Sequence, residues 1–265
     1  MCNTCGCSVT SGNEELAHEP SPEHGGTTPI QVLDRLLKAN DHEAAHNREH
    51  LERHGVLAIN LMSSPGSGKT SLLEATADAL GGRLKFAVIE GDLETENDAA
   101  RIRAKGIPAH QITTGTACHL DAHMVHHALH HLSLEGLDVL FIENVGNLVC
   151  PASFDLGHHL NVTLLSTTEG DDKPAKYPVM FRAANLVAVT KCDLMEVLGD
   201  FSIEKAEGHV RDLANGAPVV SVSTRAPGGL DGWIAWLESA VAAHRSGTRF
   251  HPSVQPDGAR RHAHG

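Results

Sequence analysis

A loop with the residues needed to bind phosphate follows the first apolar segment of the chain. Ser63-Ser-Pro-Gly-Ser-Gly-Lys-Thr70 lies between the apolar run 55–61 and the helical pattern 71–80. In such a loop, glycines let backbone N–H groups turn toward phosphate oxygens, a lysine reaches the terminal phosphate, and a threonine offers its hydroxyl to Mg²⁺. The predicted nucleotide contacts are Gly66, Ser67, Gly68, Lys69, Thr70 and Ser71, and Lys69 and Thr70 also take part in hydrolysis.

One position departs from the usual pattern of this loop. The motif begins with glycine, whereas this chain has Ser63 there. The alternative interpretation is an ordinary turn of glycine and serine before a helix. The strand pattern before the loop and the helix pattern after it favour phosphate binding.

The residues 190–193 indicate which base is bound. Thr190-Lys-Cys-Asp193 follows an apolar strand pattern, where guanine-binding proteins have Asn-Lys-x-Asp. The aspartate accepts hydrogen bonds from guanine N1–H and the exocyclic amine, which adenine does not offer in that arrangement. We predict that Lys191 and Asp193 recognise guanine, with Ser223 near a second base contact and with weaker binding because Thr190 replaces asparagine. A simple strand-end turn is the alternative.

Carboxylates at strand ends are the expected partners of Thr70 around Mg²⁺. Asp92 and Glu143 each follow a buried strand pattern, and the carboxyl ends of parallel strands meet at one edge of a sheet. Asp98, a little further along, is a candidate for orienting the attacking water. Hydrolysis should be slow, because no arginine is identifiable that would stabilise the transition state.

Two groups of thiols and imidazoles suggest metal binding. Cys118-His119 and Cys150 follow different core elements, and two thiolates with one imidazole suit Zn²⁺ or Ni²⁺. Buried structural cysteines are the alternative. At the N-terminus, Cys2, Cys5 and Cys7 lie too close together for a core to form between them, so a compact thiolate chelate is predicted.

Histidine is unusually abundant, with 20 residues in the chain. A helix over 119–131 would place His119, His123, His127 and His131 on one face at steps of four residues. A solvated polar face and a weak metal-binding face are both consistent with this pattern.

Composition and periodicity predict one folded domain between two tails. The chain alternates apolar strand patterns with helical stretches from residue 29 to 245, which is typical of an α/β fold of the P-loop class with a mostly parallel sheet flanked by helices. Residues 1–28, which contain cysteine and histidine, and residues 246–265 are predicted to be disordered tails. The net charge of −12, with histidine neutral, argues against nucleic acid as a partner.

The cysteines and the absence of a membrane-spanning pattern bear on location. No apolar run approaches the roughly 18 to 20 residues that cross a membrane, and the N-terminus does not resemble a signal peptide. We therefore expect a cytoplasmic protein without a membrane partner, with thiols kept reduced as metal ligands.

Taken together, six segments resemble the HypB family, the GTPases that help insert nickel into nickel–iron hydrogenase. The segments that carry the likeness are 2–7, 63–70, 89–102, 118–122, 143–151 and 169–174. The resemblance implies a GTP-dependent homodimer that passes nickel to the hydrogenase large subunit with a HypA-type accessory protein. It also implies an interfacial metal site at Cys118, His119 and Cys150, and a tight nickel site in the N-terminal cysteines.

Two other functions are compatible with parts of this pattern. A urease-type nickel GTPase has the same fold, but the N-terminal cysteines and the pair Cys118-His119 count against it. A nickel or zinc storage protein with a vestigial nucleotide site is the second alternative. The intact residues Lys69, Thr70 and Asp193 count against that one.

Overall fold

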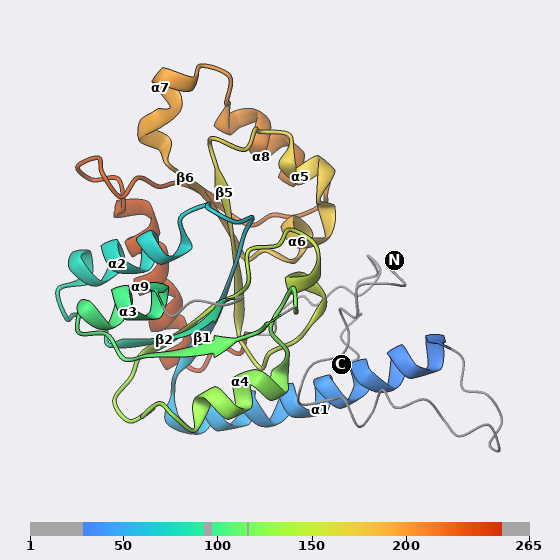
Figure 1. Cartoon of the computed structure of the whole chain (residues 1–265). Coiled ribbons are helices and arrows are strands. Elements are labelled where there is room, and N and C mark those ends of the chain that lie inside the picture. Colours follow the sequence, from blue (N-terminus) through green and yellow to red (C-terminus); the bar gives the residue numbers. More distant parts are fainter. Residues whose placement is uncertain (1–28, 93–96, 116, 251–265) are drawn as a thin grey trace.

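The computed structural model describes residues 29–92, 97–115 and 117–250, which form an α/β fold around one sheet (Figure 1). The N-terminal cysteines Cys2, Cys5 and Cys7 lie outside the described residues, as do the expected tail 1–28 and all but the first residues of the expected tail 246–265. Within the described ranges, no helix is both long and apolar enough to span a membrane.

The sheet contains seven strands in the order β3-β2-β4-β1-β5-β6-β7, and every neighbouring pair is parallel. The strands are β1 Leu57–Met62, β2 Phe86–Asp92, β3 Ala109–Thr113, β4 Val139–Glu143, β5 Leu160–Ser166, β6 Leu186–Thr190 and β7 Val219–Ser221. The predicted α/β class with a mostly parallel sheet flanked by helices is confirmed.

Helices connect the strands and cover both faces of the sheet. The α-helices are α1 Pro29–His54, α2 Lys69–Leu80, α3 Asn97–Ala104, α4 Ala122–Leu129, α5 Lys173–Lys176, α6 Pro178–Ala183, α7 Met195–Leu198, α8 Ile203–Asp212 and α9 Asp231–Arg245. Two short 3₁₀ helices, η2 Cys150–Ser153 and η3 Cys192–Leu194, follow β4 and β6.

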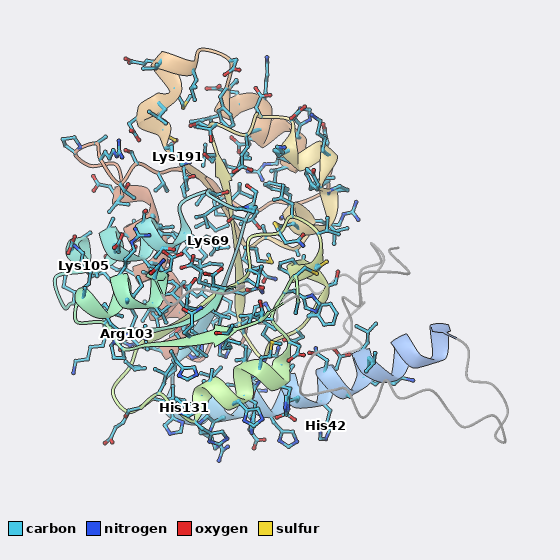
Figure 2. The ribbon with its side chains drawn as sticks, viewed as in Figure 1. His42, Lys69, Arg103, Lys105, His131 and Lys191 are labelled. Carbon is cyan, nitrogen blue, oxygen red and sulfur yellow. The ribbon has the colours of Figure 1, made fainter. Side chains whose placement is uncertain are left out.

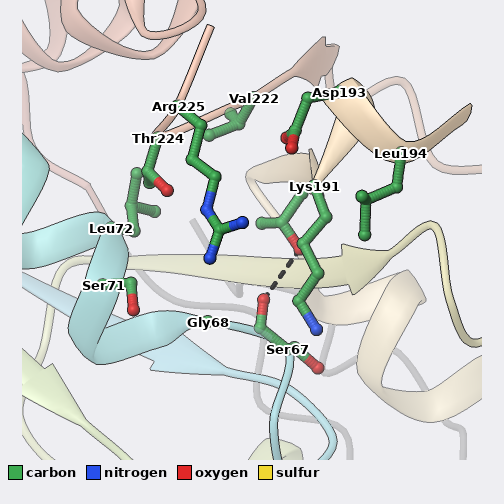
Figure 3. Close-up of a pocket in the computed structure, with 11 residues that line it drawn as sticks. Ser67, Gly68, Ser71, Leu72, Lys191, Asp193, Leu194, Val222, Thr224 and Arg225 are labelled. Atoms are coloured by element: carbon green, nitrogen blue, oxygen red, sulfur yellow. Dashed lines mark hydrogen bonds between the residues drawn. The ribbon is translucent and has the colours of Figure 1, made fainter.

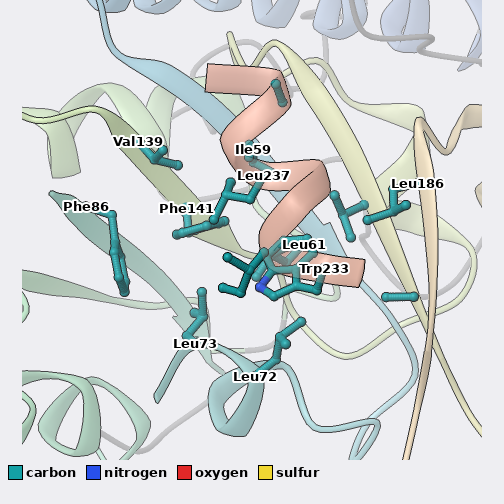
Figure 4. Packing of buried hydrophobic residues seen from close by; sticks show 14 of the residues in the cluster. Ile59, Leu61, Leu72, Leu73, Phe86, Val139, Phe141, Leu186, Trp233 and Leu237 are labelled. Atoms are coloured by element: carbon teal, nitrogen blue, oxygen red, sulfur yellow. The ribbon is translucent and has the colours of Figure 1, made fainter. Parts of the chain in front are cut away.

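Alternation along the strands divides the core into two layers. In β1, Leu57, Ile59 and Leu61 pack on one face with α2 and α9, whereas Ala58 packs on the other face with α1 and α4. Figure 4 shows Trp233 of α9 packed among these apolar side chains of the first layer. Its indole Nε1 donates to Thr76 Oγ1 of α2 at 2.8 Å, so the buried N–H is satisfied.

The histidine-rich helix is shorter than the sequence pattern predicts. The helix α4 begins at Ala122 because the Asp121 side chain accepts a hydrogen bond from Met124 N and caps it. His119 therefore lies before the helix and His131 lies after it. The predicted stripe of four histidines over 119–131 is wrong.

Candidate nucleotide and metal site

The loop that follows β1 has the backbone conformation of a phosphate-binding loop. Gly66 and Gly68 have φ of 75° and 94°, in the left-handed region that glycine adopts without strain. Lys69 is buried, and its Nζ donates to Ser63 Oγ at 3.1 Å. The serine that replaces glycine at the start of the motif therefore holds the lysine side chain over the loop.

Two glutamates near the carboxyl ends of neighbouring strands, Glu143 of β4 and Glu90 of β2, meet beside Thr70 of α2. Thr70 Oγ1 donates to Glu143 Oε1 at 2.9 Å, and Glu143 at the end of β4 is in register with Glu90 of β2. Burial, and then the neighbouring Glu143 charge, raise the pKa of Glu90 to about 11. Burial also raises the pKa of Glu143, against the opposing effect of the Lys69 charge.

This carboxyl pair fits a cation as well as a shared proton. The Oε2 atoms of Glu90 and Glu143 are buried, and no donor in the described ranges gives either of them a hydrogen bond. A carboxyl proton between them or a divalent cation beside Thr70 would satisfy both. Glu90 was not predicted from the sequence, because it lies inside an apolar run and its pairing with Glu143 is visible only in the register of β2 and β4.

The other two acidic candidates lie near this pair in different settings. Asp92 ends β2 and is half-buried, and its backbone carbonyl accepts from Thr114 N at 2.9 Å. Asp98 lies in the first turn of α3, where Arg101 Nη1 donates to its Oδ1 at 2.8 Å. Arg101 also donates to Ser71 Oγ at 3.3 Å, so this arginine links two of the predicted site residues.

The residues predicted to bind the base line a cavity beside the phosphate-binding loop (Figure 3). The cavity has a volume of about 340 Å³ and is lined by Ser67, Gly68, Ser71, Leu72, Thr190, Lys191, Asp193, Leu194, Val222, Thr224 and Arg225. Such a volume is within the range of small-molecule sites. Ser223 does not line it but donates from Oγ to Asp193 Oδ1 at 2.7 Å, which orients the carboxylate.

Two hydrogen bonds tie the base-side residues to the phosphate-binding loop. Thr190 Oγ1 donates to the Ser67 carbonyl at 2.7 Å, and Lys191 Nζ donates to the Gly66 carbonyl at 2.8 Å. Lys191 has φ of 59°, a left-handed conformation that is uncommon for residues other than glycine. Conformations of this kind are concentrated at functional sites.

Glu169, which follows β5, also contacts this loop. Its Oε1 accepts from Ser67 Oγ at 2.6 Å and from Ser166 N at 3.3 Å. Glu169 lies in segment 169–174, one of those that carry the family resemblance, but no role of its own was predicted for it from the sequence. The Glu169 carboxylate therefore lies next to the loop that is predicted to bind the phosphates.

Cys118, His119 and Cys150 form a compact cluster. Their ligand atoms lie within 4.8 Å of one another, with the two Sγ atoms 3.1 Å apart and Cys118 Sγ 3.5 Å from His119 Nδ1. Both cysteines are half-buried. His119 is buried and stacks on Phe154 with ring centroids 3.9 Å apart.

The protonation state of His119 suits a metal ligand. Burial lowers its pKa to about 4, so the imidazole is neutral at pH 7 and offers a lone pair. Two thiolates and one neutral imidazole are a donor set for Ni²⁺ or Zn²⁺.

Two asparagines after β4 contact the segments that carry this cluster, and one of them, Asn147, also contacts the phosphate-binding loop. Asn147 N donates to the Ser63 carbonyl at 2.8 Å, and Asn147 Oδ1 accepts from Val149 N at 2.8 Å and Cys150 N at 3.4 Å. Asn144 Oδ1 accepts from Leu120 N at 3.1 Å, directly after His119. The segments that carry the cluster are thus hydrogen-bonded to the loop after β4, and this loop contacts the phosphate-binding loop through Asn147 N.

The parallel sheet and the loop after β1 define a P-loop nucleotide-binding protein of the kind that hydrolyses nucleotides. Residues 57–221 match the family model described as CobW/HypB/UreG, nucleotide-binding domain. The chain belongs to the HypB family of hydrogenase maturation factors. It is 51% identical over 226 residues to "Hydrogenase maturation factor HypB" of Azotobacter vinelandii, which covers 85% of this chain and 72% of that protein.

Solved structures agree with this assignment. HypB from Helicobacter pylori, crystallised in complex with nickel, is 44% identical, with a TM-score of 0.75 over 80% of this chain and 97% of that chain. HypB from Archaeoglobus fulgidus is 39% identical, with a TM-score of 0.72 over 77% of this chain and 100% of that chain. The family and the fold that the sequence motifs resembled are therefore confirmed.

Proposed function

We propose that this protein is a GTPase that delivers nickel to the large subunit of nickel–iron hydrogenase. The observation that carries the proposal is the Cys118, His119 and Cys150 cluster, whose segments are hydrogen-bonded to the loop that contacts the phosphate-binding loop. A family member crystallised with nickel supports nickel as the cargo. A HypA-type accessory protein, a homodimer and a cytoplasmic location belong to the same proposal.

The preference for guanine rests on Asp193 and its setting. Its carboxylate would accept hydrogen bonds from guanine N1–H and the exocyclic amine, and Ser223 holds it through Oγ at 2.7 Å. Lys191 would cover the base while its ammonium remains on the Gly66 carbonyl. The nucleotide would thus bridge the base cavity and the phosphate-binding loop.

The carboxyl pair is the proposed Mg²⁺ site, with Thr70 as a further ligand. When bound, Mg²⁺ would neutralise charge on the nucleotide phosphates. Thr70 and Glu143 would hold the ion directly or through water, and Asp92 is a further candidate. Lys69, released from Ser63, would reach the terminal phosphate, and Asp98 is the candidate for orienting the attacking water.

The bound nucleotide would affect the geometry of the metal cluster through Asn147. The terminal phosphate would order the loop after β4, and this loop positions Cys150 through the two bonds to Asn147 Oδ1. After hydrolysis the loop would relax, the thiolate geometry would change and nickel would be released. This is the phosphate-sensing logic of nucleotide switches.

The first experiment measures GTP hydrolysis and Ni²⁺ binding on one preparation of the full chain. Wild type is compared with Cys118→Ala, with the triple variant Cys2→Ala, Cys5→Ala and Cys7→Ala, and with Lys69→Ala. Support would be hydrolysis of GTP but not ATP that Lys69→Ala abolishes, with separate nickel sites lost in the two sets of cysteine variants. Hydrolysis without specific nickel sites would overturn the proposal, and Zn²⁺ is tested in parallel because the same ligands suit it.

A storage or buffering protein is the second candidate, favoured only by the abundance of histidine, with 20 residues. It would bind several equivalents of metal with no response to nucleotide. A urease-type client is tested by adding the purified apo-urease in place of the hydrogenase large subunit.

A further inference from the structure

The helices α1 and α4 pack side by side and present many histidines to one surface, here called the histidine face. Its residues are His42, His46, His50 and His54 of α1, and His123, His126, His127 and His130 in or next to α4. Figure 2 shows side chains of this region pointing away from the sheet, with His131 and His42 labelled near its two ends. None of these residues belongs to the cluster of Cys118, His119 and Cys150, called the thiolate cluster from here on.

Two pairs of rings on α4 face each other one helical turn apart. His126 Nε2 lies 3.2 Å from His130 Nε2, and His123 Nε2 lies 3.1 Å from His127 Nε2. Two imidazole nitrogens bound to one Zn²⁺ or Ni²⁺ at about 2.0 to 2.1 Å are separated by roughly 2.9 to 3.4 Å, depending on the angle at the metal. Both pairs have this spacing, so spacing alone does not distinguish them.

The setting of His126 does distinguish them. Its Nδ1 lies 3.1 Å from Asn47 Oδ1 and 3.0 Å from Glu43 Oε1, both on α1. Asn47 is fully buried, and its Nδ2 already donates to the carbonyls of Ala122 at 2.8 Å and Leu156 at 3.2 Å. The amide orientation is therefore fixed, and Oδ1 is the atom that faces the ring.

This orientation fixes the tautomer of His126. Two oxygen acceptors at Nδ1 require that Nδ1 carries the proton, so the lone pair lies on Nε2, the atom that faces His130. A metal-ligating histidine characteristically donates its other N–H to a carboxylate or an amide or backbone oxygen. By contrast, among the residues that the structure describes, no oxygen acceptor holds Nδ1 of His123 or His127.

We infer that His126 and His130 bind a divalent transition-metal ion of the Ni²⁺ and Zn²⁺ class, at a site separate from the thiolate cluster. Glu43 and Asn47 are the positioning residues, and His50 of α1 is the next imidazole beside the pair. The His126 side chain is 38% exposed and His130 is exposed, so an ion can reach the pair from solvent. Imidazole is the common neutral ligand for these ions.

Two imidazoles of the histidine face have a pKa below the usual value for histidine. Burial is the main cause that lowers the pKa of His126, and the neighbouring histidines act in the same direction against Glu43. The pKa of His50 is lowered mainly by burial and then by the neighbouring His54 and Arg53. His130 and His126 also lower it. Neutral imidazoles are the form that binds metal.

The test counts Ni²⁺ bound to the full-length chain by equilibrium dialysis with NiCl₂. The background variant carries serine at Cys2, Cys5, Cys7, Cys118 and Cys150, so that both predicted thiolate sites are removed and Cys192 is the one cysteine left. In that background, His126→Ala with His130→Ala should remove one equivalent of Ni²⁺, while the matched pair His123→Ala with His127→Ala should keep it. Far-ultraviolet circular dichroism checks that each variant is folded.

The positioning residues give a second measurement that a purely structural role would not affect. Glu43→Ala should weaken Ni²⁺ binding about tenfold, at the lower end of the usual effect of removing such a partner. Glu43→Gln keeps an oxygen acceptor and should lose less. Equal loss of Ni²⁺ from both histidine pairs, or no loss from either, would overturn the proposal. The dialysis is repeated with both histidine double variants made in the chain with all its cysteines, in case the cysteine background does not fold. There too, His126→Ala with His130→Ala should bind one equivalent of Ni²⁺ less than His123→Ala with His127→Ala.

Discussion

Thr190 donates a hydrogen bond from Oγ1 to the Ser67 carbonyl at 2.7 Å, and through it the strand that leads to the base cavity is tied to the phosphate-binding loop. Both side chains are buried. This threonine stands where guanine-binding proteins have asparagine. A side chain with one hydroxyl is therefore enough to join the two loops, and the missing asparagine does not by itself separate the base site from the phosphate site.

Replacing Thr190 tests this link. Thr190→Val keeps the shape but leaves the Ser67 carbonyl without its donor, which costs about 1 to 1.5 kcal/mol. We expect roughly tenfold weaker binding of a fluorescent GDP analogue, measured by titration. Thr190→Ser keeps the hydroxyl and is the matched control. Equal affinity of the valine and serine variants would show that the hydrogen bond does not support the site.

Asp193→Asn should change which base is preferred. In the amide, one acceptor oxygen of the carboxylate is replaced by an NH₂ donor. The remaining oxygen can accept from N1–H, and the NH₂ can donate to the carbonyl that xanthine carries in place of the guanine amine. We expect GDP to bind at least about 100-fold more weakly, because charged hydrogen bonds are lost, and xanthosine diphosphate to bind more tightly than GDP. Competition titrations with both nucleotides measure this. Ser223→Ala, which removes only the orienting bond, should have a smaller effect, and an unchanged preference in Asp193→Asn would remove Asp193 from base recognition.

Gly146 lies where a side chain would strike the phosphate-binding loop. A Cβ at this position would be 2.8 Å from Pro65 Cα and 2.9 Å from Pro65 N, both backbone atoms. Gly146→Ala should therefore push the loop after β4 away, at a cost of about 1 to 3 kcal/mol in unfolding free energy. We expect kcat for GTP to fall more than GDP affinity does. Gly208→Ala, on a helix where a Cβ meets no atom, is the control.

Strands β1, β2, β4, β5 and β6 could be predicted because each is an apolar run buried on both faces of the sheet. The edge strand β3, Ala109–Thr113, was missed because its residues are only partly buried and include histidine and glutamine. Strands of this kind carry little periodic signal. Glu90 was missed for a related reason, since it lies inside an apolar run and only the register with β4 reveals its partner Glu143.

The prediction of a helix from histidine spacing was wrong where a capping residue lies inside the pattern. The histidine spacing predicted a helix through 119–131, but the Asp121 cap starts the helix after His119 and leaves that ring free to join the cysteines. The contacts of His126 with Glu43 and Asn47 depend on how α1 packs on α4. Packing between helices that are far apart in sequence is not encoded in either helix alone.

The buried ring of His158 should make stability depend on pH. Burial lowers its pKa to about 4, with the Arg48 charge acting in the same direction and Asp155 opposing. Because the folded pKa is below the unfolded value near 6.5, protons bind more readily to the unfolded chain, and stability is lost as pH falls from about 6.5 toward 4. The loss at pH 5 should be about 2 kcal/mol relative to pH 7.

Urea unfolding at pH 7 and pH 5 measures this effect. His158→Gln cannot take up the proton and should lose less stability between the two pH values than wild type. The control is His209→Gln, at a side chain that is 36% exposed. A wild-type difference that survives unchanged in His158→Gln would assign the pH dependence to other groups.

Asn147 is the residue through which nucleotide state should reach the thiolate cluster. Asn147→Ala removes the acceptor for Val149 N and Cys150 N but keeps the backbone bond from Asn147 N to the Ser63 carbonyl. If the side chain carries the coupling, Ni²⁺ affinity with a GTP analogue and with GDP should become more alike, by a factor of about five to ten for one lost hydrogen bond. Asn147→Asp keeps an acceptor and should retain the difference. Ni²⁺ titrations in both nucleotide states decide between these outcomes, and an undiminished difference in Asn147→Ala would place the coupling on the Asn144 bond to Leu120 N instead.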